Sequence, residues 1–211
     1  MFVRDRMSRN PQVVRAEETL RRARELMGER GFEALPVTEN GHLAGIVTHW
    51  DILRALGRAT DPGYLDGARV ADVMTREVRA VRPDDVIEEA AWYMSRHDYT
   101  ALPVVEEDGT LVGIITAHDL FHALVDMLAI TAPGTRVTLV VPDRVGILAR
   151  IAEVVRDAGV SIASVAIFPR DAPGWAEVVL RLKTTEAKDC VDRLVAAGFN
   201  VTHVSLVWAE S

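Results

Sequence analysis

The sequence predicts an α+β protein of 211 residues, in which a β-α-β-β-α unit occurs twice and a β-α-β-β-α-β unit follows. Three observations support this fold class. An internal repeat occupies the first part of the chain. Within each copy, apolar residues recur first at helical and then at extended spacing. After Ala132, Pro133 and Gly134 the pattern changes and a different unit begins.

The repeat relates residues 3–37 to residues 70–104 at a constant offset of 67. The tetrapeptide Ala-Leu-Pro-Val recurs within it, at residues 34–37 and 101–104. One extra residue then enters at residues 106–109, and the offset becomes 68. Because a hairpin turn tolerates an inserted residue at little cost, this position of the gap supports a repeat of folded units.

Each copy begins with a short extended segment, residues 13–15 and 80–82. A helix follows in each copy, because apolar residues recur at helical spacing: Leu20, Ala23 and Met27, then Ile87, Ala90 and Met94. The acidic residues that precede these positions suit a helix N-terminus. Gly31 and Asp98 are placed to end the two helices.

A hairpin and a second helix complete each copy. Two short β-branched or apolar runs flank a glycine-containing turn in each case: residues 35–38 and 43–48, then 102–105 and 111–116. A final helix is expected to begin near Thr48 and near Thr116. These boundaries predict a first repeat at residues 1–56, a linker at 57–69 that is rich in Gly, Asp and Ala, and a second repeat at 70–127.

The remaining residues, 134–208, alternate strands and helices once more. The expected strands are residues 136–141, 160–167, 175–182 and 201–207. One helix is expected to present an apolar face made of Val145, Leu148, Ile151, Ala152 and Val155. A second helix covers residues 187–197. The order is therefore β-α-β-β-α-β, the ferredoxin-like arrangement.

The hairpin and the helix after it carry a repeated motif. Residues 45–51 and 113–119 each read Gly, two β-branched residues, Thr, two variable residues and Asp, and each follows a Leu-Pro-Val strand. This pattern resembles the CBS domain, and two copies in tandem resemble a CBS pair, or Bateman module. The resemblance covers residues 1–125 and implies that an adenosine compound binds between the repeats.

The resemblance implies a set of adenosine-binding residues: Leu35, Pro36, Thr48, Trp50, Asp51, Leu102, Pro103, Thr116, His118 and Asp119. A carboxylate accepts two hydrogen bonds, which suits the two hydroxyls of a ribose. Threonine hydroxyls and the free N–H groups of a helix start suit a phosphate. The Leu-Pro pairs offer an apolar wall to an adenine. An alternative interpretation is simple helix N-capping by Thr and Asp, which needs no ligand.

Two positions in this set depart from a pattern seen in some members of the family. Where those members have an arginine before the aspartate, this chain has Trp50 and His118. Trp50 can stack on a base but carries no charge, and His118 contacts a phosphate only weakly near neutral pH. We therefore expect two unequal sites with modest affinity for phosphate.

The last unit resembles an ACT domain through the motif Asp-x-x-Gly-x-Leu-x-x-Ile at residues 143–151, directly after a strand. The resemblance implies an effector site lined by residues of this turn and of the next strand start: Asp143, Val145, Gly146, Ile147 and Ser161. Many amino-acid-binding ACT domains have Asn at the place of Ser161. The alternative is that Gly146 only permits close packing of helix and strand.

Composition and single residues exclude several function classes. The formal net charge of −7 disfavours a nucleic-acid binder, because neutralising phosphates requires a basic surface. The single Cys190 is interpreted as a small core residue. His118 and His122 have metal-ligand spacing but no evident third ligand, so no metal site is predicted. No signal core or membrane-spanning apolar run occurs, and we expect a cytoplasmic protein.

No catalytic motif or phosphate-binding loop occurs, so the chain is not expected to be an enzyme or to need a cofactor. The order CBS–CBS–ACT resembles the acetoin-utilisation (AcuB-type) proteins. It implies a sensor of an adenosine compound (AMP, ATP, S-adenosylmethionine or another), with an amino acid bound at the ACT domain and an unidentified regulated protein in acetoin or carbon metabolism. Exposed edge strands predict a homodimer. The alternative is a structural oligomerisation module that binds no ligand.

Overall fold

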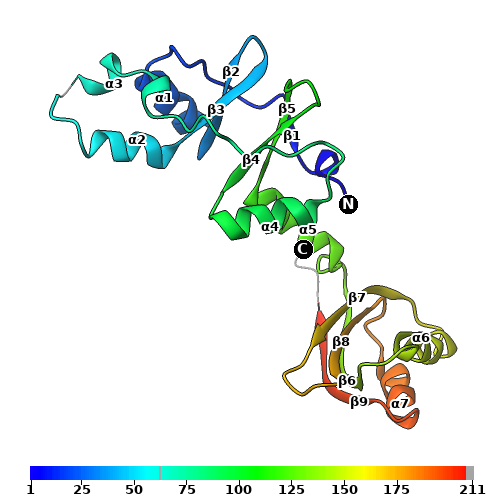
Figure 1. Ribbon diagram of the computed structural model, residues 1–211. Coiled ribbons are helices and arrows are strands. Elements are labelled where there is room, and N and C mark those ends of the chain that lie inside the picture. The colour runs from blue at the N-terminus through cyan, green and yellow to red at the C-terminus, as the bar shows by residue number, and fades with distance from the viewer. Residues whose placement is uncertain (62, 208–211) are drawn as a thin grey trace. The chain divides into compact units, whose positions relative to one another are not determined.

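The computed structural model describes residues 1–61 and 63–207, and it divides into two compact units between Phe121 and His122 (Figure 1). Pro62 of the expected linker and residue 208, the last of the expected ACT domain, lie outside the described residues. Each unit has its own hydrophobic core, and each is described by itself below.

The first unit contains the two expected copies of helix, hairpin and helix, except that the last helix, α5, continues past Phe121. The first copy has α1 (Leu20–Arg30), β2 (Ala34–Glu39), β3 (His42–Thr48) and α2 (His49–Leu56). The second has α4 (Ile87–His97), β4 (Ala101–Val105), β5 (Leu111–Thr116) and α5 (Ala117–Met127). The extended segments before α1 and α4 are reduced to single parallel bridges, Val14 to Val37 and Val81 to Val104.

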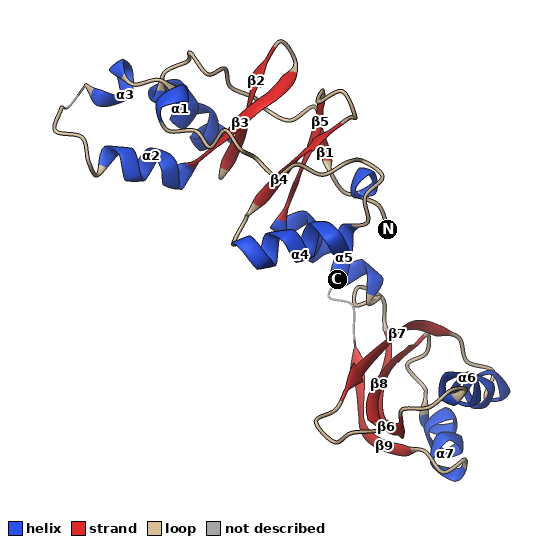
Figure 2. Cartoon of the chain, in the orientation of Figure 1, coloured by secondary structure: helices blue, strands red, loops and turns tan. Residues whose placement is uncertain are grey.

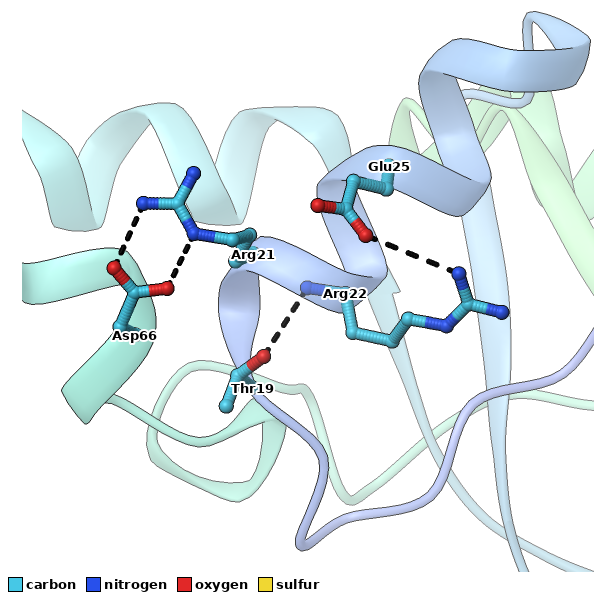
Figure 3. A network of polar contacts seen from close by, with 5 residues as sticks. All are labelled: Thr19, Arg21, Arg22, Glu25 and Asp66. Carbon is cyan, nitrogen blue, oxygen red and sulfur yellow. Dashed lines mark hydrogen bonds and ion pairs between the residues drawn. The ribbon is translucent and has the colours of Figure 1, made fainter.

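Local residues begin and end these helices as expected. The Thr19 hydroxyl accepts a hydrogen bond from the Arg22 N–H at the start of α1 (Figure 3). Gly31 follows α1 with φ of 69°, and Asp98 follows α4 with φ of 56°, so both residues take the left-handed conformation of a helix C-cap. The predicted helix ends are confirmed.

The expected linker at residues 57–69 is in large part folded onto the first repeat. It contains α3 (Tyr64–Gly67), and Leu65 and Ala68 are buried in the core of that repeat. Asp66 of α3 forms an ion pair with Arg21 of α1 (Figure 3), and this hydrogen-bonded partner lowers the pKa of Asp66. Composition suggested a linker, but Leu65 supplies the apolar anchor that orders the segment.

The N-terminal segment of each repeat crosses to the other repeat. The short strand β1 (Ser8–Arg9) pairs with β5, and Thr75 exchanges two 2.9 Å backbone hydrogen bonds with Ile46 of β3. The motif glycines allow this approach, because a Cβ at Gly45 would lie 2.8 Å from the Thr75 carbonyl oxygen. At Gly113 a Cβ would lie 3.0 Å from the Ser8 carbonyl oxygen. Glycine is therefore required for strand crossing at both positions.

The second unit is a four-stranded antiparallel sheet in the order β7-β8-β6-β9, with two helices on one face (Figure 2). Its elements are β6 (Gly134–Pro142), α6 (Ile147–Asp157), β7 (Ile162–Pro169), β8 (Trp175–Leu182), α7 (Lys188–Ala196) and β9 (Asn200–Val207). The core lies between the sheet and the helices. This confirms the ferredoxin-like arrangement.

The buried face of α6 differs from the expected one. Ile147, Ile151 and Val155 are buried, whereas Val145 and Leu148, which the sequence placed on the apolar face, are exposed. Ala152, also expected there, is exposed too. The reason is the start of the helix: Gly146 is its left-handed N-cap, so Val145 precedes the helix and the buried stripe begins at Ile147.

Candidate functional site

The Thr and Asp of the repeated motif form a capping box at the start of α2 and of α5. In the first copy, the Thr48 N–H and hydroxyl donate to Asp51 Oδ2 over 2.9 and 2.6 Å, and the Asp51 N–H donates to the Thr48 hydroxyl. Thr116 and Asp119 repeat this arrangement at 2.8 and 2.7 Å. The capping interpretation therefore describes the geometry of both copies.

The capping box leaves acceptor capacity on each carboxylate. Both hydrogen bonds that each carboxylate accepts end on Oδ2, and within the described part of the chain no hydrogen bond involves Oδ1 of Asp51 or Asp119. A carboxylate offers about four lone-pair sites. Capping and ligand binding are consequently compatible: Oδ2 holds the helix start and Oδ1 is available to a hydroxyl.

A cavity of about 780 Å³ surrounds the motif of the first repeat. Its walls come from four segments of both repeats: the end of α1 with the turn after it, the β3–α2 junction, residues 75–79, and residues 97–102 from the end of α4 to the start of β4. It contains Thr48, Trp50 and Asp51, and the Trp50 side chain is 74% exposed. An aromatic ring this open is accessible to a stacking partner.

A second cavity of about 660 Å³ has an equivalent construction around the motif of the second repeat. It combines Thr116 and His118 with residues 8–12, which are the repeat counterparts of residues 75–79. Residues 30–35, at the end of α1 and the start of β2, complete it. Because the N-terminal segments cross between repeats, neither cavity can form from one repeat alone.

Each of the two predicted wall leucines lines the cavity that contains the motif of the other repeat. Leu102 of the second repeat lines the cavity that holds Thr48 and Asp51, and Leu35 of the first repeat lines the cavity that holds Thr116. Both leucines are almost completely buried, so each presents backbone or a small part of its side chain. The sequence placed these residues in the sites but did not show which site each would join.

Three of the predicted residues line neither cavity. Pro36 and Pro103 are buried within β2 and β4, and their carbonyl oxygens accept hydrogen bonds from the Val14 and Val81 N–H groups at 3.1 and 3.0 Å. Their backbone groups therefore serve strand pairing rather than a ligand. Asp119 is occupied by its capping box and is not part of the second cavity wall.

The structure adds charged residues that the motif did not reveal. Arg54 and Arg79 line the first cavity, and Arg9 and Arg30 line the second. The Arg79 guanidinium lies 4.1 Å above the centre of the Tyr93 ring and donates a hydrogen bond to its hydroxyl. Arg9 and Arg79 reach the cavities because their segments cross between repeats, for which the sequence carries no local signal.

The predicted effector residues of the second unit divide between surface and core. Asp143, Val145, Gly146 and Ser161 are exposed, whereas Ile147 is buried and cannot line an open site. A Cβ at Gly146 would meet no atom within 4 Å, so close packing does not explain this glycine. Its φ of 83° does, because the left-handed conformation favours glycine.

Other expected features also have clear positions. Cys190 is buried in the core of the second unit, as predicted, and desolvation raises the pKa of its thiol. No cluster of three or more His, Cys, Asp or Glu residues that could hold a metal ion occurs among residues 1–61 and 63–207. In the same residues, no helix is long and apolar enough to cross a membrane.

Comparison with known families assigns the chain to a class. The model of the CBS domain matches residues 3–58 and 70–126, and the model of the TTHA0829-like ACT domain matches residues 133–205. The chain therefore belongs to the CBS-domain family, with a CBS pair followed by an ACT domain. The recognition of both domains from their motifs is confirmed.

Solved structures of CBS pairs resemble the first unit. An acetoin utilization protein (AcuB) from Vibrio cholerae is 31% identical with a TM-score of 0.55, over 62% of this chain and 94% of that one. CBSX2 in complex with AMP is 29% identical (TM-score 0.52, 59% and 96% covered). The CBS pair of MJ0100, in complex with 5′-methylthioadenosine and S-adenosyl-L-methionine, is 26% identical (TM-score 0.53, 59% and 95% covered).

Curated relatives are larger proteins, and this chain matches a part of each. A homoserine O-acetyltransferase of Methanococcoides burtonii is 39% identical over 119 residues, which are 56% of this chain and 23% of the enzyme. An inosine-5′-monophosphate dehydrogenase of Korarchaeum cryptofilum is 38% identical over 110 residues, 52% of this chain and 21% of the enzyme. The chain thus spans less than a quarter of either relative.

Proposed function

We propose that this chain is a non-catalytic regulator that binds adenosine compounds in the two cavities of its CBS pair. The crosswise construction of the cavities carries the proposal: each combines the Thr-containing motif of one repeat with the N-terminal segment of the other. The AMP, 5′-methylthioadenosine and S-adenosylmethionine held by the solved relatives support this class of ligand.

The geometry suggests a role for each group in the first cavity. Asp51 Oδ1 accepts hydrogen bonds from the ribose hydroxyls, and Trp50 stacks on the base. Arg54 and Arg79 supply the positive charge that the motif itself lacks, so a phosphate binds more tightly than the motif alone suggests. In the second cavity this charge comes from Arg9 and Arg30, and the two sites are unequal because their aromatic residues differ.

Binding at a site built from both repeats is suited to regulation. A ligand that contacts both repeats binds best to one arrangement of them, and it stabilises that arrangement by its difference in affinity. We propose that the regulated partner distinguishes the two arrangements. The likeness to AcuB supports a place in acetoin or carbon metabolism, and an amino acid at the exposed loop 143–146 and Ser161 is the proposed second effector.

The ligand class is tested by thermal shift and calorimetry with AMP, ATP, S-adenosylmethionine and 5′-methylthioadenosine. At least one compound should raise the melting temperature saturably, and Asp51→Ala should weaken its binding at the first site at least tenfold. Asp72→Ala is a matched control, because Asp72 caps the Arg69 N–H at 2.8 Å but lines neither cavity.

Arg9→Gln tests the second site, because Arg9 lines that cavity, and it should weaken the binding of a phosphate-bearing adenosine compound more than it lowers stability. If no adenosine compound changes the melting temperature, the proposal is wrong and a purely structural oligomerisation module is favoured. Turnover of ATP by the purified protein would contradict the non-catalytic assignment.

A further inference from the structure

Two arginines face each other on the sheet of the second unit. Arg136 of β6 and Arg181 of β8 are directly opposed in the antiparallel register, and Val137 and Leu180 next to them point into the helix-covered core. Because side chains alternate along a strand, both arginines lie on the face that α6 and α7 do not cover. Like charges in opposed positions destabilise a sheet, so this pair calls for a compensating group.

Among residues 1–61 and 63–207, no carboxylate compensates the charges of the two arginines. Neither arginine forms an ion pair within residues 1–61 and 63–207. Glu177 lies on the same face of β8, but four residues along a strand separate it from Arg181 by roughly 13 Å. In the described part of the chain, the positive charge on this face is therefore not balanced by an ion pair.

Arg181 is also incompletely satisfied. Its side chain is 7% exposed, its Nη2 donates to the Ile130 carbonyl oxygen at 3.2 Å, and its Nε is buried without a hydrogen-bond partner. Burial lowers the pKa of Arg181, and the charge of Arg136 lowers it further. Arginine remains charged in proteins. The burial of Arg181 and its repulsion from Arg136 therefore raise the free energy of the unliganded protein.

The two arginines and the serines that flank them form a row across the four strands of the sheet. In register, Ser164 of β7 is opposite Arg181, and Ser205 of β9 is opposite Arg136. The Ser164 hydroxyl donates to the Leu128 carbonyl oxygen at 2.9 Å, and Arg181 donates to that of Ile130. Residues 128–130 therefore cover Ser164 and Arg181. Arg136 and Ser205 are half-buried, so both are partly exposed to solvent, unlike Arg181.

We propose that this face of the sheet binds a phosphate group, held by the guanidinium groups of Arg136 and Arg181 and the Ser205 hydroxyl. A phosphate dianion balances both charges, and its several oxygens accept the fork-shaped donors of two arginines. A single carboxylate would balance only one of them. This site is separate from the CBS cavities and does not depend on the proposed adenosine binding.

The test uses the full chain, titrated with inorganic phosphate and separately with AMP at constant ionic strength. Phosphate should bind the wild type saturably, and Arg136→Gln should weaken that binding at least tenfold. Arg193→Gln is the charge-matched control, because Arg193 lies on α7, on the other side of the sheet, and pairs with Asp189. An AMP binding event that also needs Arg136 would identify a nucleotide as the source of the phosphate.

Stability without ligand separates this role from a structural one. Arg136→Gln should raise the melting temperature in phosphate-free buffer, because it removes the repulsion from Arg181, and should abolish the further rise that phosphate causes. Arg181→Gln also removes the donor to the Ile130 carbonyl oxygen, whereas Arg136→Gln removes only the donor to the Thr138 hydroxyl, so Arg136→Gln is the decisive variant. Equal phosphate affinity of the wild type and Arg136→Gln, or a lower melting temperature of the unliganded variant, would overturn the proposal.

Discussion

The Thr48 and Asp51 side chains cap α2 and also line the first cavity, where we propose that they bind the ligand. The hydroxyl and Oδ2 satisfy N–H groups at the start of α2, which no helical carbonyl can reach. Asp51 lines the first cavity, and its Oδ1 accepts no hydrogen bond from the described residues. The motif therefore stabilises the fold in the absence of ligand. A substitution in the motif is expected to change the free energy of unfolding and the ligand affinity, and the two effects are measured separately.

The capping contribution is measurable through the hydroxyl. Thr116→Val removes the acceptor for the Asp119 N–H and should lower the free energy of unfolding by about 1 kcal/mol, the usual value for a lost N-cap. Thr116→Ser keeps the hydroxyl and should change the free energy of unfolding much less. Urea denaturation measures both variants, and equal losses would show that the hydroxyl is not the stabilising group.

At the scale of elements, the crossing of N-terminal segments joins the two repeats. β1 pairs with β5 of the second repeat, and Thr75 pairs with β3 of the first. The hairpin tips also meet, through hydrogen bonds from the Leu43 N–H to the Gly109 carbonyl oxygen and from the Leu111 N–H to the Gly41 carbonyl oxygen. The repeats consequently fold as one unit, and both cavities depend on this exchange.

Two glycines of the first repeat should respond in opposite directions to substitution by alanine. Gly45→Ala places a Cβ 2.8 Å from the Thr75 carbonyl oxygen and should lower the free energy of unfolding by about 1–3 kcal/mol. Gly28→Ala, within α1 and with no atom within 4 Å of its Cβ, should raise it by about 1 kcal/mol. If chemical denaturation shows Gly45→Ala to be neutral, the strand crossing is not as close as described.

At the scale of the whole molecule, the two edge strands of the second unit carry exposed apolar residues. Val165 and Ile167 lie on β7, and Val204 and Leu206 lie on β9. Unpaired strand edges with apolar side chains favour association with another strand. We therefore propose that a second copy of this chain pairs with this sheet.

Light scattering at micromolar concentration should give about twice the chain mass of 23.2 kDa. Ile167→Lys should shift the mass toward the monomer, because a charged edge strand disfavours pairing. Val195→Lys, at an exposed apolar position on α7, is the control and should leave the mass unchanged. A monomeric wild type would refute the dimer.

Much of the fold could be predicted because it depends on local or repeated patterns. The repeat, the helix ends at Gly31 and Asp98, and the β-α-β-β-α-β order all correspond to short stretches of sequence. The prediction that was wrong concerns the limit of an element. Val145 seemed to continue the apolar face of α6, because periodicity does not show where a helix begins. The linker at 57–69 was predicted from its Gly, Asp and Ala content, and composition does not show that Leu65 is buried.

The sequence by itself determined the two kinds of domain and the motif residues Thr48, Trp50 and Thr116, which the structure places in the two cavities. Only the tertiary structure decided that each cavity takes its wall from the opposite repeat, that Pro36 serves strand pairing, and that Arg136 faces Arg181. Capping and periodicity act over a few residues and are visible in order along the chain. Strand crossing and register join residues far apart in the sequence, and they are determined by packing of the whole unit.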